Sequence, residues 1–130
     1  MPILDTSFLV DLLRRRGEAL ALLAELEEKG APLYTTPITA LELYRGAFLS
    51  ANPERNLAAA KKLLASLVVL PLDDEACIIF GALSSRLRSE GRRIGDFDEV
   101  IAAIALARDR EMVTRDGHFR EVAGIKVVGW

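Results

Sequence analysis

Short apolar segments alternate with longer helical segments along this 130-residue chain, and the alternation restricts the possible folds more than any other feature. Helical connections between short apolar strands are typical of a mainly parallel sheet with helices packed on it. We therefore expect an α/β, three-layer fold with about five strands, formed by a single domain over residues 1–130. The expected strands are residues 3–4, 33–36, 67–70, 112–114 and 125–128.

Helix-boundary signals lie between these strands. Leucines recur at helical spacing in residues 9–13 and 18–29, and Gly30 is expected to end the second of these helices. Asp73 is expected to cap a long helix that Gly91 ends. The other helices are expected from about residue 39, at 53–66 after Asn52-Pro53, and from 96 to about Arg110.

The composition is that of a globular protein, with 51% hydrophobic and 28% charged residues. The net charge of -2 argues against a protein built entirely as a basic clamp for nucleic acid. A local basic rim around an acidic site remains compatible with this charge, because a bound metal ion would offset the carboxylates.

The single cysteine, Cys77, lies in an apolar helical stretch, and we expect it to be a buried small hydrophobe. One cysteine excludes a disulfide framework, which fits the reducing cytoplasm. The beginning of the chain shows no signal-peptide pattern. No apolar stretch approaches the length of about 18 residues that a membrane span needs. The expected location is therefore cytoplasmic, without a membrane.

Four carboxylates stand at the ends of the expected strands or in the first turns of the expected helices. Loops beyond the carboxyl ends of parallel strands converge on one crevice, so these side chains should meet there. Like charges repel, so packing does not explain such a cluster, whereas a divalent cation among the carboxylates does. We call this set the acidic quartet: Asp5, Glu42, Asp98 and Asp116.

Two members of the acidic quartet also have a simple local explanation. Asp5, Thr6 and Ser7 are all good helix caps, and if Asp5 is a metal ligand then Thr6 or Ser7 is left to cap the helix. Thr39 and Glu42 have the spacing of a capping box, in which Glu42 would bind the amide of Thr39. A first-turn carboxylate can serve both roles, so both explanations stay open.

The other two members are similarly ambiguous. Asp96 and Glu99 repeat the capping-box spacing, but that cap does not need Asp98. Asp98 precedes the apolar run 100–107, which predicts a buried helix whose amino-terminal dipole favours negative charge. Asp116 precedes Gly117, and this dipeptide is typical of a turn.

The basic residues add one histidine and two groups of arginines. His118 is expected to be a surface or packing histidine rather than a general base, and a single histidine excludes a two-histidine ribonuclease mechanism. No Ser-His-Asp or Cys-His nucleophile set is evident. The arginines at 14–16 and at 86, 88, 92 and 93 form either a solvated face or a rim that contacts phosphates.

The order of these motifs is more specific than any one of them. Together they resemble the PIN-domain ribonucleases, most closely the VapC toxins of VapBC toxin–antitoxin pairs, over essentially the whole chain. On this resemblance the acidic quartet matches the catalytic acids of the family, while Asp96 falls at a variable position and is accessory. The motifs are Leu4-Asp5-Thr6-Ser7, Ile38-Thr39-x-x-Glu42-Leu43-x-x-Gly46, Ile94-Gly95-x-x-Asp98-x-x-Ile101-Ala102-Ala103 and Val113-Thr114-Arg115-Asp116-x-x-Phe119.

The resemblance implies a PIN-like fold and a metal-dependent endoribonuclease that acts as the toxin of a type II system. It also implies an RNA substrate, a VapB-like antitoxin that covers the site, and a homodimer. Carboxylate oxygens suit Mg²⁺ or Mn²⁺. We expect Asp5 and Asp98 to be the main direct ligands, and Glu42 and Asp116 to hold metal-bound waters or a second ion.

Two other functions are compatible with an acidic pocket. One is a catalytically silent binding module whose pocket docks a protein partner. A weaker alternative is a phosphatase with Asp5 as an aspartyl nucleophile. That chemistry usually needs a second aspartate two residues later, where this chain has Ser7.

Overall fold

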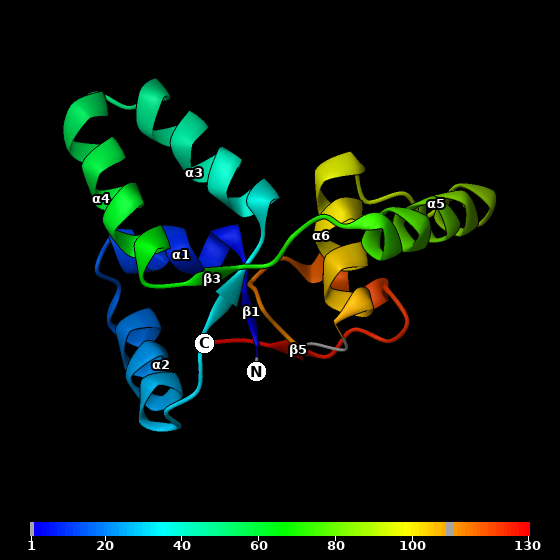
Figure 1. Cartoon of the computed structure of the whole chain (residues 1–130), viewed down its shortest axis with the longest axis horizontal. Coiled ribbons are helices and arrows are strands. Elements are labelled where there is room, and N and C mark those ends of the chain that lie inside the picture. The colour runs from blue at the N-terminus through cyan, green and yellow to red at the C-terminus, as the bar shows by residue number, and fades with distance from the viewer. Residues whose placement is uncertain (1, 109–110) are drawn as a thin grey trace.

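The computed structural model describes residues 2–108 and 111–130, and within them the expected α/β architecture is confirmed (Figure 1). Every expected strand is present, although each is only two residues long, and helices join them. The elements are β1 (Ile3–Leu4), α1 (Thr6–Leu13), α2 (Gly17–Glu28), β2 (Tyr34–Thr35), α3 (Pro37–Leu49), α4 (Pro53–Ala65), β3 (Val68–Val69), α5 (Asp74–Ser89), α6 (Asp96–Ala107), β4 (Met112–Val113), the 3-10 helix η1 (Gly117–Glu121) and β5 (Val127–Val128).

The strands form one parallel sheet in the order β3-β2-β1-β4-β5. The chain builds outward from β1 to β3, then crosses back to place β4 on the other side of β1. The strand order therefore reverses between β1 and β4. In open α/β sheets the ligand crevice lies beyond the carboxyl ends of the strands at such a reversal.

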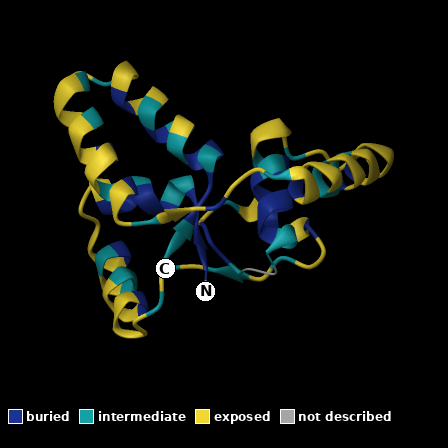
Figure 2. Ribbon diagram, viewed as in Figure 1, coloured by how far each residue is buried: buried dark blue, intermediate teal, exposed yellow. Residues whose placement is uncertain are grey.

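Successive residues of the strands point to opposite faces of the sheet and fill two separate cores. Ile3 and Met112 are buried on the face covered by α5 and α6, whereas Leu4 and Val113 are buried on the face covered by α1 to α4. Figure 1 shows these two helical layers on either side of the strands. In Figure 2 the buried residues concentrate in the central strand β1 and in α6, whereas the edge strand β3 is exposed.

Helix α6 is the most deeply buried helix of the part described, because its apolar run has few polar positions. Residues 101–105 are all buried, as the sequence predicted. The helix ends at Ala107, and the expected end near Arg110 lies outside the described residues. Its burial fixes the first turn, which carries Asp98, against the sheet.

Helix α3 begins two residues earlier than the sequence indicated. Thr36 is the N-cap, and its hydroxyl accepts a hydrogen bond from the Thr39 amide at 3.1 Å. Pro37 occupies the first helical position, where its fixed φ suits a helix start. The expected capping box of Thr39 and Glu42 is therefore wrong, and Glu42 lies in the second turn with no capping role.

The N-cap expected at Asp73 is confirmed, and Asn52, which was expected only to separate two helices, is also an N-cap. Asn52 and Asp73 accept hydrogen bonds from the amides of Arg55 and Ala76, at 3.3 Å and 3.0 Å.

Cys77 is exposed, so the expectation that it is buried was wrong. Helix α5 packs one face against α6 through residues that include Ala76, Leu83 and Leu87. Cys77 follows Ala76 by one position, about 100° around the helix, and so leaves that face. The apolar pattern of this segment identified a helix but not which of its sides is covered.

The carboxyl-terminal residue Trp130 ties the end of the chain to α1. Its ring lies edge-on to Phe8 with 5.0 Å between centroids, and its Nε1 donates to Asp11 Oδ2 at 3.1 Å. The Arg115 guanidinium lies over the same indole and forms an ion pair with Asp11 at 2.9 Å. These contacts hold the segment after β4 close to α1.

Among the described residues, no helix has the length and apolar character needed to cross a membrane.

Candidate active site

The structure brings the acidic quartet together at the carboxyl edge of the sheet, where the strand order reverses. Strand β1 runs directly into Asp5, and β4 runs through Thr114 toward Asp116. Helices α3 and α6, which carry Glu42 and Asp98, start at the same edge (Figure 1). The four segments are far apart in sequence, and the topology of the sheet alone makes them neighbours.

Asp5 is buried, with 5% of its surface exposed, and occupies the N-cap position of α1 without making a side-chain capping bond. Its Oδ2 instead accepts a hydrogen bond from the Thr114 hydroxyl at 2.7 Å. Burial raises the pKa of Asp5, the Thr114 bond opposes this, and the charges of Glu42 and Asp116 raise it further. The Asp5 carboxylate therefore belongs to the acidic cluster and not to the helix start.

The hydroxyls next to Asp5 do not cap α1, contrary to the expectation from sequence. The Thr6 hydroxyl donates to Glu42 Oε1 at 2.8 Å, joining α1 to α3. The Ser7 hydroxyl accepts from the Arg115 amide at 3.1 Å, joining α1 to the turn after β4. Both residues lie within α1, and both orient segments that carry members of the acidic quartet.

Thr114 is the central hydroxyl of the site. It is 1% exposed, donates to Asp5, and accepts from the Asp116 amide at 3.0 Å. One hydroxyl thus sets the positions of two carboxylates.

Replacing Thr114 with valine should lower both stability and any activity of the site, because it removes the Asp5 partner and leaves the Asp116 amide unpaired. The expected loss of stability is about 1–3 kcal/mol. Thr114→Ser keeps the hydroxyl and should restore most of the activity. Denaturant unfolding and cleavage rates of the two variants measure this, and equal behaviour of valine and serine would contradict it.

Asp98 has the largest pKa shift of the carboxylates in the described part of the chain. Its pKa rises to about 6, mainly because of burial and the charge of Asp116, with smaller effects of Asp5 and Glu42, while a hydrogen bond with His118 opposes the rise. Each other member of the quartet therefore disfavours ionisation of Asp98. Mutual repulsion of this kind is what the sequence predicted for a converged cluster without a cation.

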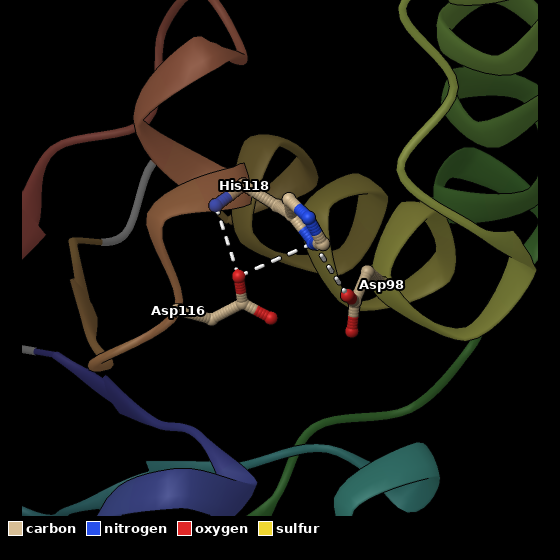
Figure 3. A group of neighbouring side chains, drawn as sticks. All are labelled: Asp98, Asp116 and His118. Carbon is tan, nitrogen blue, oxygen red and sulfur yellow. Dashed lines mark hydrogen bonds and ion pairs between the residues drawn. The ribbon is translucent and has the colours of Figure 1, made fainter.

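The tightest part of the cluster is formed by Asp98, Asp116 and His118 (Figure 3). One ligand atom from each lies within 4.8 Å of the other two. The Asp116 side chain also accepts from the His118 amide at 2.9 Å, so Asp116 does form the expected turn while belonging to the cluster. His118 is exposed, as predicted, but the sequence analysis did not place its imidazole in the site. The Asp-x-His spacing at the start of a short 3-10 helix was the available signal.

The PIN-domain family model matches residues 3–125 of this chain. The chain belongs to the PIN-domain family.

Its curated relatives are VapC ribonucleases. Ribonuclease VapC2 of Haemophilus influenzae is 30% identical over 98% of this PIN domain and 96% of the relative. The tRNA(fMet)-specific endonuclease VapC of Salmonella typhimurium is 36% identical over 72% of this chain and 71% of its own length. The solved structure of DNA-bound VapBC from Salmonella typhimurium superimposes with a TM-score of 0.88 at 30% identity, covering 100% of this chain and 99% of that one.

Two arginines of the expected basic rim of this PIN domain are engaged in ion pairs within the chain. Arg93 binds Glu99 and the exposed Asp96, and Arg92 lies near Glu90 and Glu121. The other arginines of the two groups are exposed: Arg14, Arg15, Arg16, Arg86 and Arg88.

The expected capping box of Asp96 and Glu99 is wrong, because Glu99 Oε2 accepts hydrogen bonds from the Ile94 amide and from Arg93 instead.

The donor set of the PIN-domain site fits a divalent cation. Carboxylates predominate, and the charges of their neighbours raise the pKa values of Asp5 and Asp98. Hydroxyls, and not lysines or arginines, bind Asp5 and Glu42. Hard oxygen ligands of this type suit Mg²⁺ or Mn²⁺.

Proposed function

We propose that this PIN domain is a divalent-metal-dependent endoribonuclease, the toxin of a type II toxin–antitoxin pair, which hydrolyses RNA phosphodiester bonds at the acidic quartet. The observation that carries the proposal is the convergence of the quartet. Thr114 contacts both Asp5 and Asp116, the neighbouring Thr6 binds Glu42, and ligand atoms of Asp98 and Asp116 lie within 4.8 Å of each other. The raised pKa of Asp98 agrees with this arrangement. The VapC names of the relatives support the substrate class.

In this proposal Asp5 and Asp98 hold Mg²⁺ or Mn²⁺, and Glu42 and Asp116 hold waters or a second ion. When bound, the ion supplies positive charge to the phosphate and lowers the pKa of water. Thr114 orients Asp5, and Thr6 orients Glu42, so the charges are set before substrate arrives. Such preorganisation accounts for much of the catalytic effect of charged groups in enzymes.

Removing divalent cations should abolish RNA cleavage by the purified protein, and adding Mg²⁺ or Mn²⁺ back should restore it. The reason is that the clustered carboxylates repel both one another and the phosphate unless a cation neutralises them. Cleavage of total RNA with and without EDTA, together with titration calorimetry, tests this. Cleavage that persists in EDTA, or active protein that binds no divalent cation, would contradict the proposal.

The alternative, a catalytically silent module whose acidic pocket docks a protein, makes a different prediction. It requires partner binding without any cleavage of RNA at any concentration of metal. The VapC relatives are named as ribonucleases, and this favours the enzyme.

We also propose a VapB-like antitoxin as the protein partner, since the similar solved structures from Salmonella typhimurium and Haemophilus influenzae are VapBC complexes. A groove of about 290 Å³ runs from Glu42 between α1 and the α3–α4 pair. Its lining is largely apolar, with Arg14 at its edge. A partner segment that lies in this groove would reach one member of the acidic quartet.

Gly46 lines this groove, and a substitution there can test whether the partner binds in it. A Cβ on Gly46 would meet no atom within 4 Å, so Gly46→Gln should fold normally while filling the groove. Inhibition of Gly46→Gln by a VapB-like antitoxin should be weaker than inhibition of the wild type. Equal inhibition would place the partner elsewhere.

Finally, we propose a homodimer. Large apolar side chains remain exposed, among them Phe48, Leu49 and Ile78, which are 64%, 81% and 66% exposed. Apolar surface of this kind often marks an interface. A monomer at micromolar concentration in light scattering would contradict the dimer.

A further inference from the structure

The imidazole of His118 lies outside the acidic quartet but against two of its members. Nδ1 is 3.2 Å from Asp116 Oδ1 and 3.5 Å from Asp98 Oδ2. Figure 3 shows the ring beside both carboxylates. The start of η1 fixes this position, because the His118 amide donates to the Asp116 side chain at 2.9 Å. The ring is therefore held beside the two carboxylates through its own backbone.

The spacing of these atoms is close to that of adjacent ligands on one ion. Ligands of a small octahedral cation lie about 2.1 Å from the ion, so neighbouring ligand atoms lie about 3 Å apart. The two distances from Nδ1 are near this value, and all three ligand atoms lie within 4.8 Å of one another. Only small side-chain rotations are needed for the three atoms to face one cation.

We propose that His118 is a ligand of a divalent cation and completes, with Asp98 and Asp116, a position of two carboxylates and one imidazole, in which Asp116 binds the ion directly and not through water. The inference rests on the proposed metal-dependent function and names the ion that this position prefers. Imidazole nitrogen is a ligand of the divalent transition ions, most strongly of Fe²⁺, Ni²⁺, Cu²⁺ and Zn²⁺. Mn²⁺, the first ion of that series, accepts it more readily than Mg²⁺, which prefers oxygen. This position therefore selects Mn²⁺ over Mg²⁺.

The composition of the chain makes a direct spectroscopic test possible. His118 is the only histidine, so any imidazole coupling in tag-free protein comes from this residue. Electron spin-echo spectroscopy of the Mn²⁺-loaded wild type should show ¹⁴N modulation, which changes when histidine is labelled with ¹⁵N. If Mn²⁺ binds without nitrogen coupling, His118 is not a ligand, although the proposed nuclease function stands. If Mn²⁺ does not bind, the inference is overturned, and if neither Mn²⁺ nor Mg²⁺ binds, the proposed metal-dependent function is overturned as well.

Calorimetry on a matched pair of variants gives a second test. Loss even of a partner that only orients a ligand typically costs about tenfold in metal affinity, so His118→Gln should weaken Mn²⁺ binding by at least about tenfold. Mg²⁺ affinity should change little. Arg120→Gln is the control, because Arg120 is an exposed cationic residue on the same short helix η1.

The outcomes of this titration are distinct. A selective loss of Mn²⁺ affinity in His118→Gln, with both affinities unchanged in Arg120→Gln, supports the inference. Equal losses for Mn²⁺ and Mg²⁺, or no loss for either, overturn it. Because the spin-echo test uses the wild type, the inference stays testable even if His118→Gln folds poorly.

Discussion

Replacing Asp98 with asparagine should abolish most RNA cleavage while leaving the protein as stable as the wild type or more so. Asparagine keeps the shape of the side chain and removes one charge from a repulsive cluster. The rate should fall by about a thousandfold, the upper range for loss of one group that stabilises charge in a transition state. A residue with a mainly structural role would show the opposite pattern, with loss of stability.

The stability gain of Asp98→Asn should depend on pH in a defined direction. Because the folded-state pKa of about 6 lies above the ordinary value of 3.8, the folded protein binds the proton more tightly than the unfolded chain. Asp98 therefore destabilises the wild type as pH rises through this interval, and the penalty is absent below it. Half-burial and solvent screening limit the gain to about 1 kcal/mol.

Denaturant unfolding without divalent cations, at pH values above and below this interval, measures the effect. The gain should be absent below pH 3.8, grow as pH rises from there, and be complete above pH 6. Asp96→Asn is the matched control, because Asp96 lies in the same helical turn, is exposed, and faces Arg93. It tests whether any negative charge at the start of α6 has the same effect. Equal losses of cleavage in the two variants would remove Asp98 from the catalytic set.

The positions of the strands could be predicted because each one is a short apolar segment between strong boundary signals. The cap at Asp73 and the helix boundary at Asn52-Pro53 depend on equally local signals, and both are confirmed. The start of α3 was placed wrongly because Thr36 and Thr39 are both good caps. The proline between them decides in favour of Thr36, since it suits the first helical position.

The convergence of the acidic quartet could be predicted from parallel topology, because the carboxyl ends of parallel strands share one edge. The contacts of the hydroxyl side chains could not be predicted in this way. Thr6, Ser7 and Thr114 have partners on other elements, between 33 and 109 positions away in sequence. The local pattern indicated caps for Thr6 and Ser7 and gave no role to Thr114, and only the assembled sheet shows that these hydroxyls orient the segments that carry the carboxylates.

The burial of Glu99 also could not be predicted from the sequence. A glutamate in the first turn of a helix usually faces water, but Glu99 is 0% exposed. Its Oε2 accepts from Arg93 Nε at 2.7 Å and from the Ile94 amide at 3.1 Å. The pair fixes the segment before α6, where Gly95 adopts a φ of 105° that side-chain-bearing residues rarely take.

Replacing Arg93 with methionine should cause the largest loss of stability among the substitutions considered, because it leaves Glu99 buried without a counter-charge. Removing one partner of a buried ion pair typically costs several kcal/mol. Burial alone would raise the pKa of Glu99, but hydrogen bonds from Arg93, Ser84 and the Ile94 amide lower it below the ordinary value of 4.5. In the wild type Glu99 therefore stabilises the fold above pH 4.5, and this stabilisation is lost as pH falls through the lowered pKa.

In Arg93→Met the contribution of Glu99 to stability should change with pH in the opposite direction. Without the guanidinium, burial raises the pKa of Glu99 above 4.5, so the variant should lose stability as pH rises through that value. The difference in the free energy of unfolding between this variant and the wild type should be largest at neutral pH and should decrease as pH falls. Adding Glu99→Gln should recover part of the loss at neutral pH. Arg92→Met is the control, because the contacts of Arg92 are exposed: ion pairs at 3.7 Å and 3.9 Å, and a hydrogen bond to the Glu121 carbonyl at 3.5 Å. Equal unfolding midpoints for Arg92→Met and Arg93→Met would show that Glu99 does not depend on its arginine.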